Sequence, residues 1–153
     1  MNHTRILGMN KDNPVLMYVL IRTDLASMTS GRACAQACHA ANYCVEKAKV
    51  YNQSLYDEWA SETWQFFGTT IVLGGTWDVL MGVALALGKA DRFRSRFNWG
   101  IVHDPEYSVQ DGDVVHLIPL DTCIWVFGRK NDLAPYLEEL PLFGQGWPQW
   151  PVI

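Results

Sequence analysis

The residues VLMYVLIRTDLASMTSGRACAQACHA, positions 15–40, carry the strongest structural signal in this sequence. Its first seven residues, Val15 to Ile21, form an almost continuous apolar run, which predicts a strand covered on both faces. A short polar loop follows. A helix rich in alanine and cysteine is then predicted from Ser30, its expected N-cap, to about Val50. The stretch therefore predicts a strand, a loop and a helix in direct succession.

The start of this helix is the best candidate for a functional site. Backbone N–H groups without partners and the helix dipole favour an anion near Ser30 and Gly31. Arg32 adds a planar cation suited to phosphate or carboxylate. Helical spacing then places a stripe of polar side chains on one face. This stripe consists of Arg32, Gln36, His39 and Tyr43.

The rest of the chain alternates between strand and helix patterns. Three further strands are predicted from short apolar runs, at residues 69–73, 97–103 and 124–127. Three further helices are predicted, at residues 55–66, 77–90 and 133–140. Because helices lie between strands, we expect crossover connections and a parallel or mixed sheet with helices on its faces.

Length and composition indicate a single globular domain. The chain has 153 residues, of which 49% are hydrophobic and 18% charged, enough for a sizeable core. We expect a core at 14–143 between an N-terminal extension, 1–13, and a Trp- and Pro-rich tail, 144–153. No apolar stretch has the length of a signal peptide or a membrane helix. A soluble cytoplasmic protein without a membrane partner is expected.

The charge balance limits the possible partners. A net charge of −4 argues against a broad nucleic-acid-binding surface. A local basic group is the exception, and it consists of Lys89, Arg92, Arg94 and Arg96. This group is suited to a phosphate backbone, but a solvated helix end with the same composition is equally expected.

The four cysteines indicate a reducing compartment. Cys34, Cys38 and Cys44 fall on one predicted helix, and Cys123 falls in a predicted strand. Buried free thiols are the expected state. A metal site built on Cys34, Cys38 and His39 is disfavoured, because the chain has no CxxC or HxxxH spacing.

A second group of candidate residues follows the strand predicted at 97–103. Ligands gather at the carboxyl ends of strands in open α/β sheets, and Asp24 and Asp104 both lie at such ends. Ser108 is predicted to share one turn with Asp104, so that the carboxylate orients water and the hydroxyl positions a proton. Simpler readings are a strand-ending Asp-Pro turn, a loop brace in which Arg22 pairs with Asp24, and a helix-face His39.

These residues resemble the type 2 peptidyl-tRNA hydrolases. The first block of that family reads approximately R-x-D-L-x-M-x-x-G-K-x-A-A-Q-x-x-H-A after an apolar strand. With one extra residue between Leu25 and Met28, nine residues match it: Arg22, Asp24, Leu25, Met28, Gly31, Ala35, Gln36, His39 and Ala40. A second family block, D-A-G-R-T, is similar to Asp104–Ser108. Arginine replaces the family lysine at position 32, and serine replaces the threonine at position 108.

The resemblance implies a compact α/β domain, a four-stranded mixed sheet flanked by helices in three layers, often assembled as a homodimer. The implied reaction is hydrolysis of the ester between a peptidyl or N-blocked aminoacyl group and the 3′ end of tRNA, without metal or cofactor. By position, the catalytic residues are Arg32, Gln36, Asp104 and Ser108. Further residues are expected to bind the substrate: Asp24, Ser30, Gly31, His39, Arg92, Arg94 and Arg96.

Two other functions use the same residues differently. The chain could keep the fold and bind a small anion, a nucleotide or a protein partner without hydrolysis. Alternatively, it could serve chiefly as an interaction protein through the Trp-rich tail. Salt-sensitive tRNA binding would favour the hydrolase, and tight binding of a small anion would favour the binding module.

Overall fold

The computed structural model describes residues 12–145, which form four strands and four helices. In chain order these are β1 Val15–Arg22, α1 Ser30–Tyr51, α2 Gln53–Ala60, β2 Thr70–Gly75, α3 Trp77–Ala90, β3 Phe97–Asp111, β4 Val114–Arg129 and α4 Lys130–Leu137. Most of the expected N-terminal extension, 1–13, and of the expected tail, 144–153, lies outside the described residues. None of the described helices is long and apolar enough to cross a membrane.

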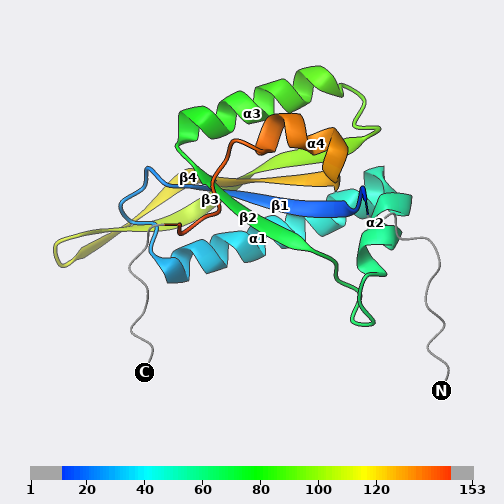
Figure 1. Cartoon of the computed structure of the whole chain (residues 1–153). Helices are drawn as coiled ribbons and strands as arrows, with labels where there is room; N and C mark the ends of the chain where they lie inside the picture. Colours follow the sequence, from blue (N-terminus) through cyan, green and yellow to red (C-terminus); the bar gives the residue numbers. More distant parts are fainter. Residues whose placement is uncertain (1–11, 146–153) are drawn as a thin grey trace.

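The four strands form one mixed sheet in the order β2-β1-β4-β3. β1 and β2 run parallel, whereas β4 runs antiparallel to both β1 and β3. Helices α1 and α2 cover one face of the sheet, and α3 and α4 cover the other (Figure 1). The predicted three-layer α/β architecture with a four-stranded mixed sheet is therefore confirmed.

Strand β1 lies at the centre of two cores. Its alternate side chains, Val15, Met17, Val19 and Ile21, pack towards α1 and α2. Those between them pack towards α3 and α4. All seven residues from 15 to 21 are at most 8% exposed. The prediction of a strand covered on both faces is confirmed, and the continuous apolar run is its physical cause.

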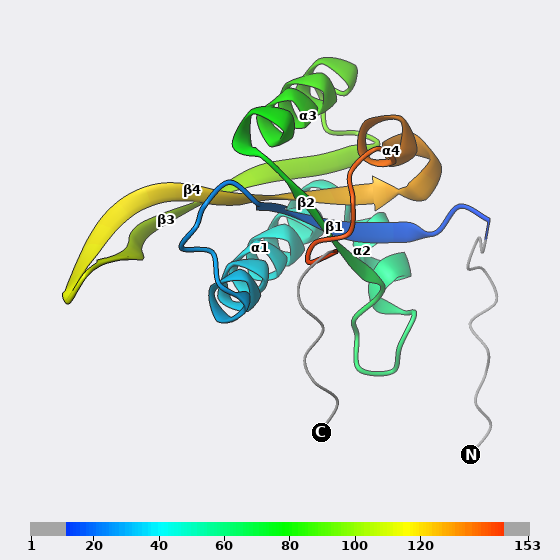
Figure 2. The same ribbon diagram turned by 60° about the vertical axis from the view of Figure 1, so that its left-hand side comes forward.

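Strands β3 and β4 are much longer than the sequence predicted. The predicted end near His103 and the predicted start at 124 were wrong. The two strands continue to Asp111 and from Val114 as a hairpin that projects beyond the helices (Figure 2). Pairing shifts register between Val102 and His103 and again between Asp104 and Tyr107. Because β3 is an edge strand, Pro105 is tolerated at such an irregularity and does not end the strand.

Three of the predicted helices have different ends. Helix α1 is capped by Thr29, whose Oγ1 accepts a hydrogen bond from the Arg32 N–H at 3.5 Å, and not by Ser30. Helix α2 ends at Ala60, and the next residues turn back so that the Trp59 indole donates to the Thr69 carbonyl at 3.0 Å. Helix α4 starts at Lys130, directly after β4, and ends at 137. Helix α3 has the predicted bounds.

Candidate active site at the edge of the sheet

Gln36, on α1, meets Asp104, in the middle of β3, where the helix packs against the sheet. Gln36 is on α1 and 4% exposed, and its Nε2 donates to Asp104 Oδ2 at 2.6 Å. The backbone N–H of Glu106 donates to Asp104 Oδ1 at 3.0 Å. Each carboxylate oxygen therefore accepts one hydrogen bond and keeps a lone pair that can accept another. The carboxylate is held in one orientation at the surface of the molecule.

Thr122, on β4, completes this group. Its Oγ1 donates to Gln36 Oε1 at 2.5 Å, and its side chain is fully buried. This hydrogen bond fixes the amide so that its NH₂ faces Asp104. The sequence analysis missed Thr122, because a single threonine inside an apolar strand carries no signal of its own. Only the pairing of β3 with β4 brings it beside Val102 and the site.

Ser108 does not join Asp104. Tyr107 and Val109 pack towards α1, so Ser108, which lies between them on a strand, points to the opposite face of the sheet. The expectation that Ser108 and Asp104 share one turn was wrong, because the segment stays extended and pairs Ser108 with Leu117. The hydroxyl nearest to Gln36 in this fold comes from Thr122 instead.

Arg32 lies one helical turn before Gln36, on the same face of α1. Its Nη1 donates to the Ser27 carbonyl at 2.8 Å, and its guanidinium lies 5.7 Å from the centre of the Tyr107 ring. The Ser27 hydroxyl and the Tyr107 hydroxyl are 3.1 Å apart. The cation is thereby tied to the loop before α1 and to β3. Ser30 and Gly31 are exposed in the first turn of the helix.

Asp24 braces the end of β1. The Nε and Nη2 of Arg22 donate to its two carboxylate oxygens at 3.0 and 2.8 Å. These hydrogen bonds from Arg22 lower the pKa of Asp24 below its usual value. Arg22 also donates to the Asp121 carbonyl at 3.1 Å, which connects the end of β1 to β4. The pairing of Arg22 with Asp24 is confirmed, and substrate binding by Asp24 stays a prediction.

A pocket of about 440 Å³ opens beside Asp104. Helix α1 contributes His39 and Tyr43 to its wall, and β3 contributes residues 101–105. Tyr43 packs edge-on against the buried Trp125 with 5.6 Å between ring centres, and it keeps 43% exposure. The pocket thus offers two aromatic side chains with a fixed carboxylate at its margin. Such rings can stack on a planar group, and a carboxylate can act as a base or accept hydrogen bonds.

Cations and aromatic rings continue from this pocket along α1. Lys47 Nζ lies 5.5 Å from the centre of the Tyr43 ring. Further along, the Arg94 guanidinium lies 5.8 Å from the centre of the Tyr51 ring and 5.6 Å from that of Trp99. Tyr43, Lys47 and Tyr51 recur every four residues and so share one face of the helix. We call Tyr43, Lys47, Tyr51 and Arg94 the aromatic–basic track; the sequence analysis did not assign Lys47 or Tyr51 to a site.

The basic group at 89–96 lies at the far end of β3 from Asp104. Asp104 lies seven positions after Phe97 on the strand, roughly 23 Å away at about 3.3 Å per residue. Arg94 donates to the Trp99 carbonyl at 3.1 Å, and Arg96 donates to the Ala90 carbonyl at 3.0 Å. The fold therefore separates the predicted substrate-binding arginines from the predicted catalytic residues.

Asp91 holds this basic loop in shape. It is 7% exposed, and its carboxylate accepts hydrogen bonds from the Arg96 N–H at 2.6 Å, the Phe97 N–H at 3.3 Å and the Ser95 hydroxyl at 3.1 Å. Burial alone raises the pKa of Asp91. The hydrogen bonds, led by that from the Arg96 N–H, outweigh burial and lower the pKa below its usual value.

Replacing Asp91 with alanine is expected to reduce the free energy of unfolding by about 1–3 kcal/mol at pH 7, because the backbone N–H groups of Arg96 and Phe97 lose their acceptor. A lowered pKa in the folded state stabilises the fold above the unfolded-state value of about 3.9, and this is lost as pH falls through the lower folded value. Urea unfolding at pH 7 and pH 3 should show a smaller difference in the free energy of unfolding between the parent and Asp91→Ala at pH 3. A difference that grows at pH 3 would contradict this assignment.

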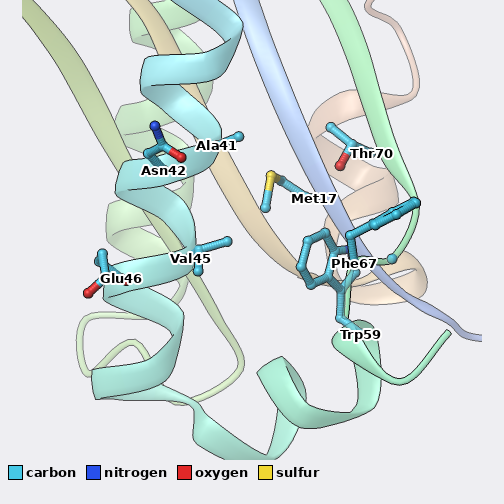
Figure 3. Close-up of a pocket in the computed structure, with 9 residues that line it drawn as sticks. Met17, Ala41, Asn42, Val45, Glu46, Trp59, Phe67 and Thr70 are labelled. Carbon is cyan, nitrogen blue, oxygen red and sulfur yellow. The ribbon is translucent and has the colours of Figure 1, made fainter. Parts of the chain in front are cut away.

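A second pocket, of about 460 Å³, lies between α1 and the start of β2 (Figure 3). Met17, Trp59 and Phe67 line it across from Ala41 and Val45 of α1. Its lining is mostly apolar, and its polar members are Asn42, Glu46 and Thr70. It lacks an arrangement like that of Gln36 and Asp104, so the pocket beside Asp104 is the better candidate for chemistry.

The cysteines are free thiols, but only two of them are buried. Cys44 and Cys123 are buried, whereas Cys34 and Cys38 are exposed, which corrects the expectation of buried thiols. Burial raises the pKa of the Cys123 thiol to about 12. Across residues 12–145, no cluster of three His, Cys, Asp or Glu side chains could hold a metal ion.

Comparison with known families identifies part of this chain. Residues 15–73 match the family model of peptidyl-tRNA hydrolase PTH2. The matched segment runs from β1 through α1 and α2 to β2, so it contains Arg32 and Gln36 but not Asp104 or Thr122. The match confirms the resemblance to the type 2 family noted at residues 22–40. No curated protein matches the chain.

Proposed function

We propose that this chain, which matches the type 2 peptidyl-tRNA hydrolases over residues 15–73, hydrolyses the ester between a peptidyl or N-blocked aminoacyl group and the 3′ end of tRNA. One observation carries the proposal: Gln36, from the matched segment, donates to Asp104 beside an open pocket. From the same resemblance, we propose that the protein acts in the cytoplasm during translation, as a homodimer.

Asp104 is the proposed general base. A water molecule bound to a free lone pair of its carboxylate is oriented and partly deprotonated as it attacks the ester carbonyl. The new bond joins the water oxygen to the carbonyl carbon, and the bond to the ribose oxygen breaks. The proton passes from the carboxyl to that leaving oxygen. General-base assistance of this kind contributes roughly 10²–10⁴-fold to a rate.

Arg32 is the proposed stabiliser of the negative charge that develops on the carbonyl oxygen. A guanidinium carries five N–H donors, and one of those in Arg32 is used by the Ser27 carbonyl. Donors that are already oriented stabilise an oxyanion strongly, because they do not need to reorganise during the reaction. Gln36 and Thr122 are positioning residues in this scheme, since they act through Asp104.

The pocket and the aromatic–basic track are the proposed tRNA site. His39 and Tyr43 offer rings on which the terminal base can stack, and base–aromatic stacking contributes about 1–3 kcal/mol per base. Lys47 and Arg94 follow along α1, in the direction of the exposed Arg92. If the 3′ end of the tRNA binds in the pocket, the phosphates that precede it would lie along this series of cations. Substrate binding by Ser30, Gly31 and Arg96 stays a prediction.

The first test is deacylation of N-acetylated aminoacyl-tRNA by the parent and by Gln36→Ala. We expect turnover in the parent and a kcat about 10-fold lower or more in Gln36→Ala, because Asp104 loses its orientation. Gln53→Ala is the matched control, since Gln53 also donates to a carboxylate, Asp57, at 2.7 Å on another helix. A well-folded parent without turnover would overturn the proposed function.

Lys47→Ala tests the route of the tRNA. We expect KM to rise about 3- to 10-fold at low salt. The slope of log kcat/KM against log salt should also fall by about 1, because one phosphate contact is lost. Lys49→Ala removes the same charge from the same helix, but Lys49 pairs with Glu46 at 3.1 Å and should leave the slope unchanged. Equal slopes in the parent and Lys47→Ala would exclude this route.

A further inference from the structure

The outer part of the β3–β4 hairpin, residues 105–120, extends past Asp104 beyond both helical layers (Figures 1 and 2). We call it the arm. Four large apolar side chains of the arm are exposed: Val114 at 55%, Val115 at 59%, Leu117 at 61% and Ile118 at 39%. A two-stranded ribbon in water is only marginally stable, and clustered exposed apolar groups mark binding surfaces. The arm is therefore suited to a partner that covers it.

The base of the arm is anchored beside the proposed active site. Tyr107 is 2% exposed, its hydroxyl lies 3.1 Å from the Ser27 hydroxyl, and the Arg32 guanidinium lies over its ring. Asp104 is three residues earlier on the same strand. An extended group that starts at the Asp104 carboxylate can therefore continue directly along the arm.

The charge of the arm excludes RNA as the group that lies along it. No lysine or arginine occurs between Arg96 and Arg129, whereas that segment holds five carboxylates. Two of these, Asp111 and Asp113, flank the tip of the arm. A phosphate backbone would be repelled. The aromatic–basic track leads away from Asp104 in the opposite direction, towards the start of β3. The acyl side of the ester therefore faces the acidic arm, and the tRNA side faces the basic track.

The outer edge of β3 offers backbone hydrogen bonds. β3 is the last strand of the sheet, and within residues 12–145 no other strand pairs with its outer side. An extended peptide can add to such an edge through main-chain N–H and C=O groups, which makes binding independent of peptide sequence. A positively charged peptide amino terminus would also be attracted to Asp111 and Asp113.

We propose that the arm binds the peptide part of peptidyl-tRNA as an added strand along the outer edge of β3. This inference rests on the proposed function and extends it, because it gives the acyl group its own binding surface. It makes long peptidyl groups the preferred substrates over single N-blocked amino acids.

The test compares acyl groups of different length. The parent should show a kcat/KM at least about tenfold higher for tRNA carrying a peptide of about six residues, roughly 20 Å when extended, than for N-acetylaminoacyl-tRNA. In a shortened arm, residues 109–116 are replaced by Asn-Gly, because Ser108 and Leu117 are directly paired and a two-residue turn can join them. In this variant kcat/KM should no longer increase with peptide length, and activity on N-acetylaminoacyl-tRNA should be retained.

Two further measurements keep the proposal falsifiable. With a peptidyl-tRNA whose alternate backbone amides are N-methylated, the unaltered parent should show no increase of kcat/KM over N-acetylaminoacyl-tRNA. Hydrogen exchange with millimolar N-acetylated peptide amide should slow at residues 107–111 of the parent. An equal gain in the shortened variant, or no gain in the parent, would overturn the arm assignment. If no tRNA substrate is hydrolysed, the proposed function fails, and the exchange measurement still decides whether the arm binds peptide.

Discussion

Asp104→Asn is expected to lower kcat for deacylation about 10²- to 10³-fold while KM changes little. Asparagine retains the shape of aspartate, but its amide is not a base and cannot accept the proton of the attacking water. Its NH₂ group would also oppose the Gln36 NH₂ if it took the place of the Oδ2 that now accepts that hydrogen bond at 2.6 Å. Single-turnover deacylation with enzyme in excess measures this loss apart from product release.

Asp121→Asn is the matched control. Asp121 lies opposite His103 on the inner strand β4 and pairs with it through its Oδ1 at 2.8 Å, so its replacement makes the same chemical change without contact to Gln36. We expect its kcat to stay within about threefold of the parent, because an exposed pair contributes little. An Asp104→Asn protein that keeps more than about a tenth of the parent kcat would exclude Asp104 as the base.

Trp125→Ala is expected to lower the free energy of unfolding by about 3–5 kcal/mol, the range for aromatic side chains removed from a core. Trp125 is 1% exposed and pairs with Gly100 across β3 and β4. A Cβ on Gly100 would lie 2.7 Å from the indole nitrogen. Glycine at position 100 therefore leaves room for the Trp125 ring. Tyr43 also loses its edge-on partner. Urea unfolding measures the loss of stability. The KM for the tRNA substrate should also rise, because Tyr43 is no longer held in place.

Trp125→Phe separates the packing of this ring from its polar atom. The indole Nε1 has no hydrogen-bond partner among the described residues, so removal of the N–H deletes a buried donor without breaking a hydrogen bond. Phenylalanine keeps much of the volume, and we expect a loss below about 1.5 kcal/mol. A loss as large as that of Trp125→Ala would show that the indole makes a polar interaction, and it would contradict the packing argument.

The elements predicted correctly are those with a strong local pattern. β1 follows from its unbroken apolar run, and α3 follows from its apolar helical composition, whose bounds 77–90 are reproduced. The same holds for the polar face of α1, because helical spacing alone aligns Arg32 with Gln36. Local signals were insufficient for the arm. Exposed apolar residues on a two-stranded ribbon lack the burial pattern that marks a strand, and Pro105 indicated a strand end.

Local sequence patterns were enough to predict the three layers, the candidate site on α1 and the family resemblance, because hydrophobic periodicity and a contiguous motif are local properties. Which residues join that candidate site depends instead on contacts between distant parts of the chain. Gln36 meets Asp104 and Thr122 across 68 and 86 residues of chain, and the sheet order β2-β1-β4-β3 brings them together. The same pairing turned Ser108 to the opposite face. Side chains alternate along a strand, so a shift of one residue at a bulge changes which groups reach the site.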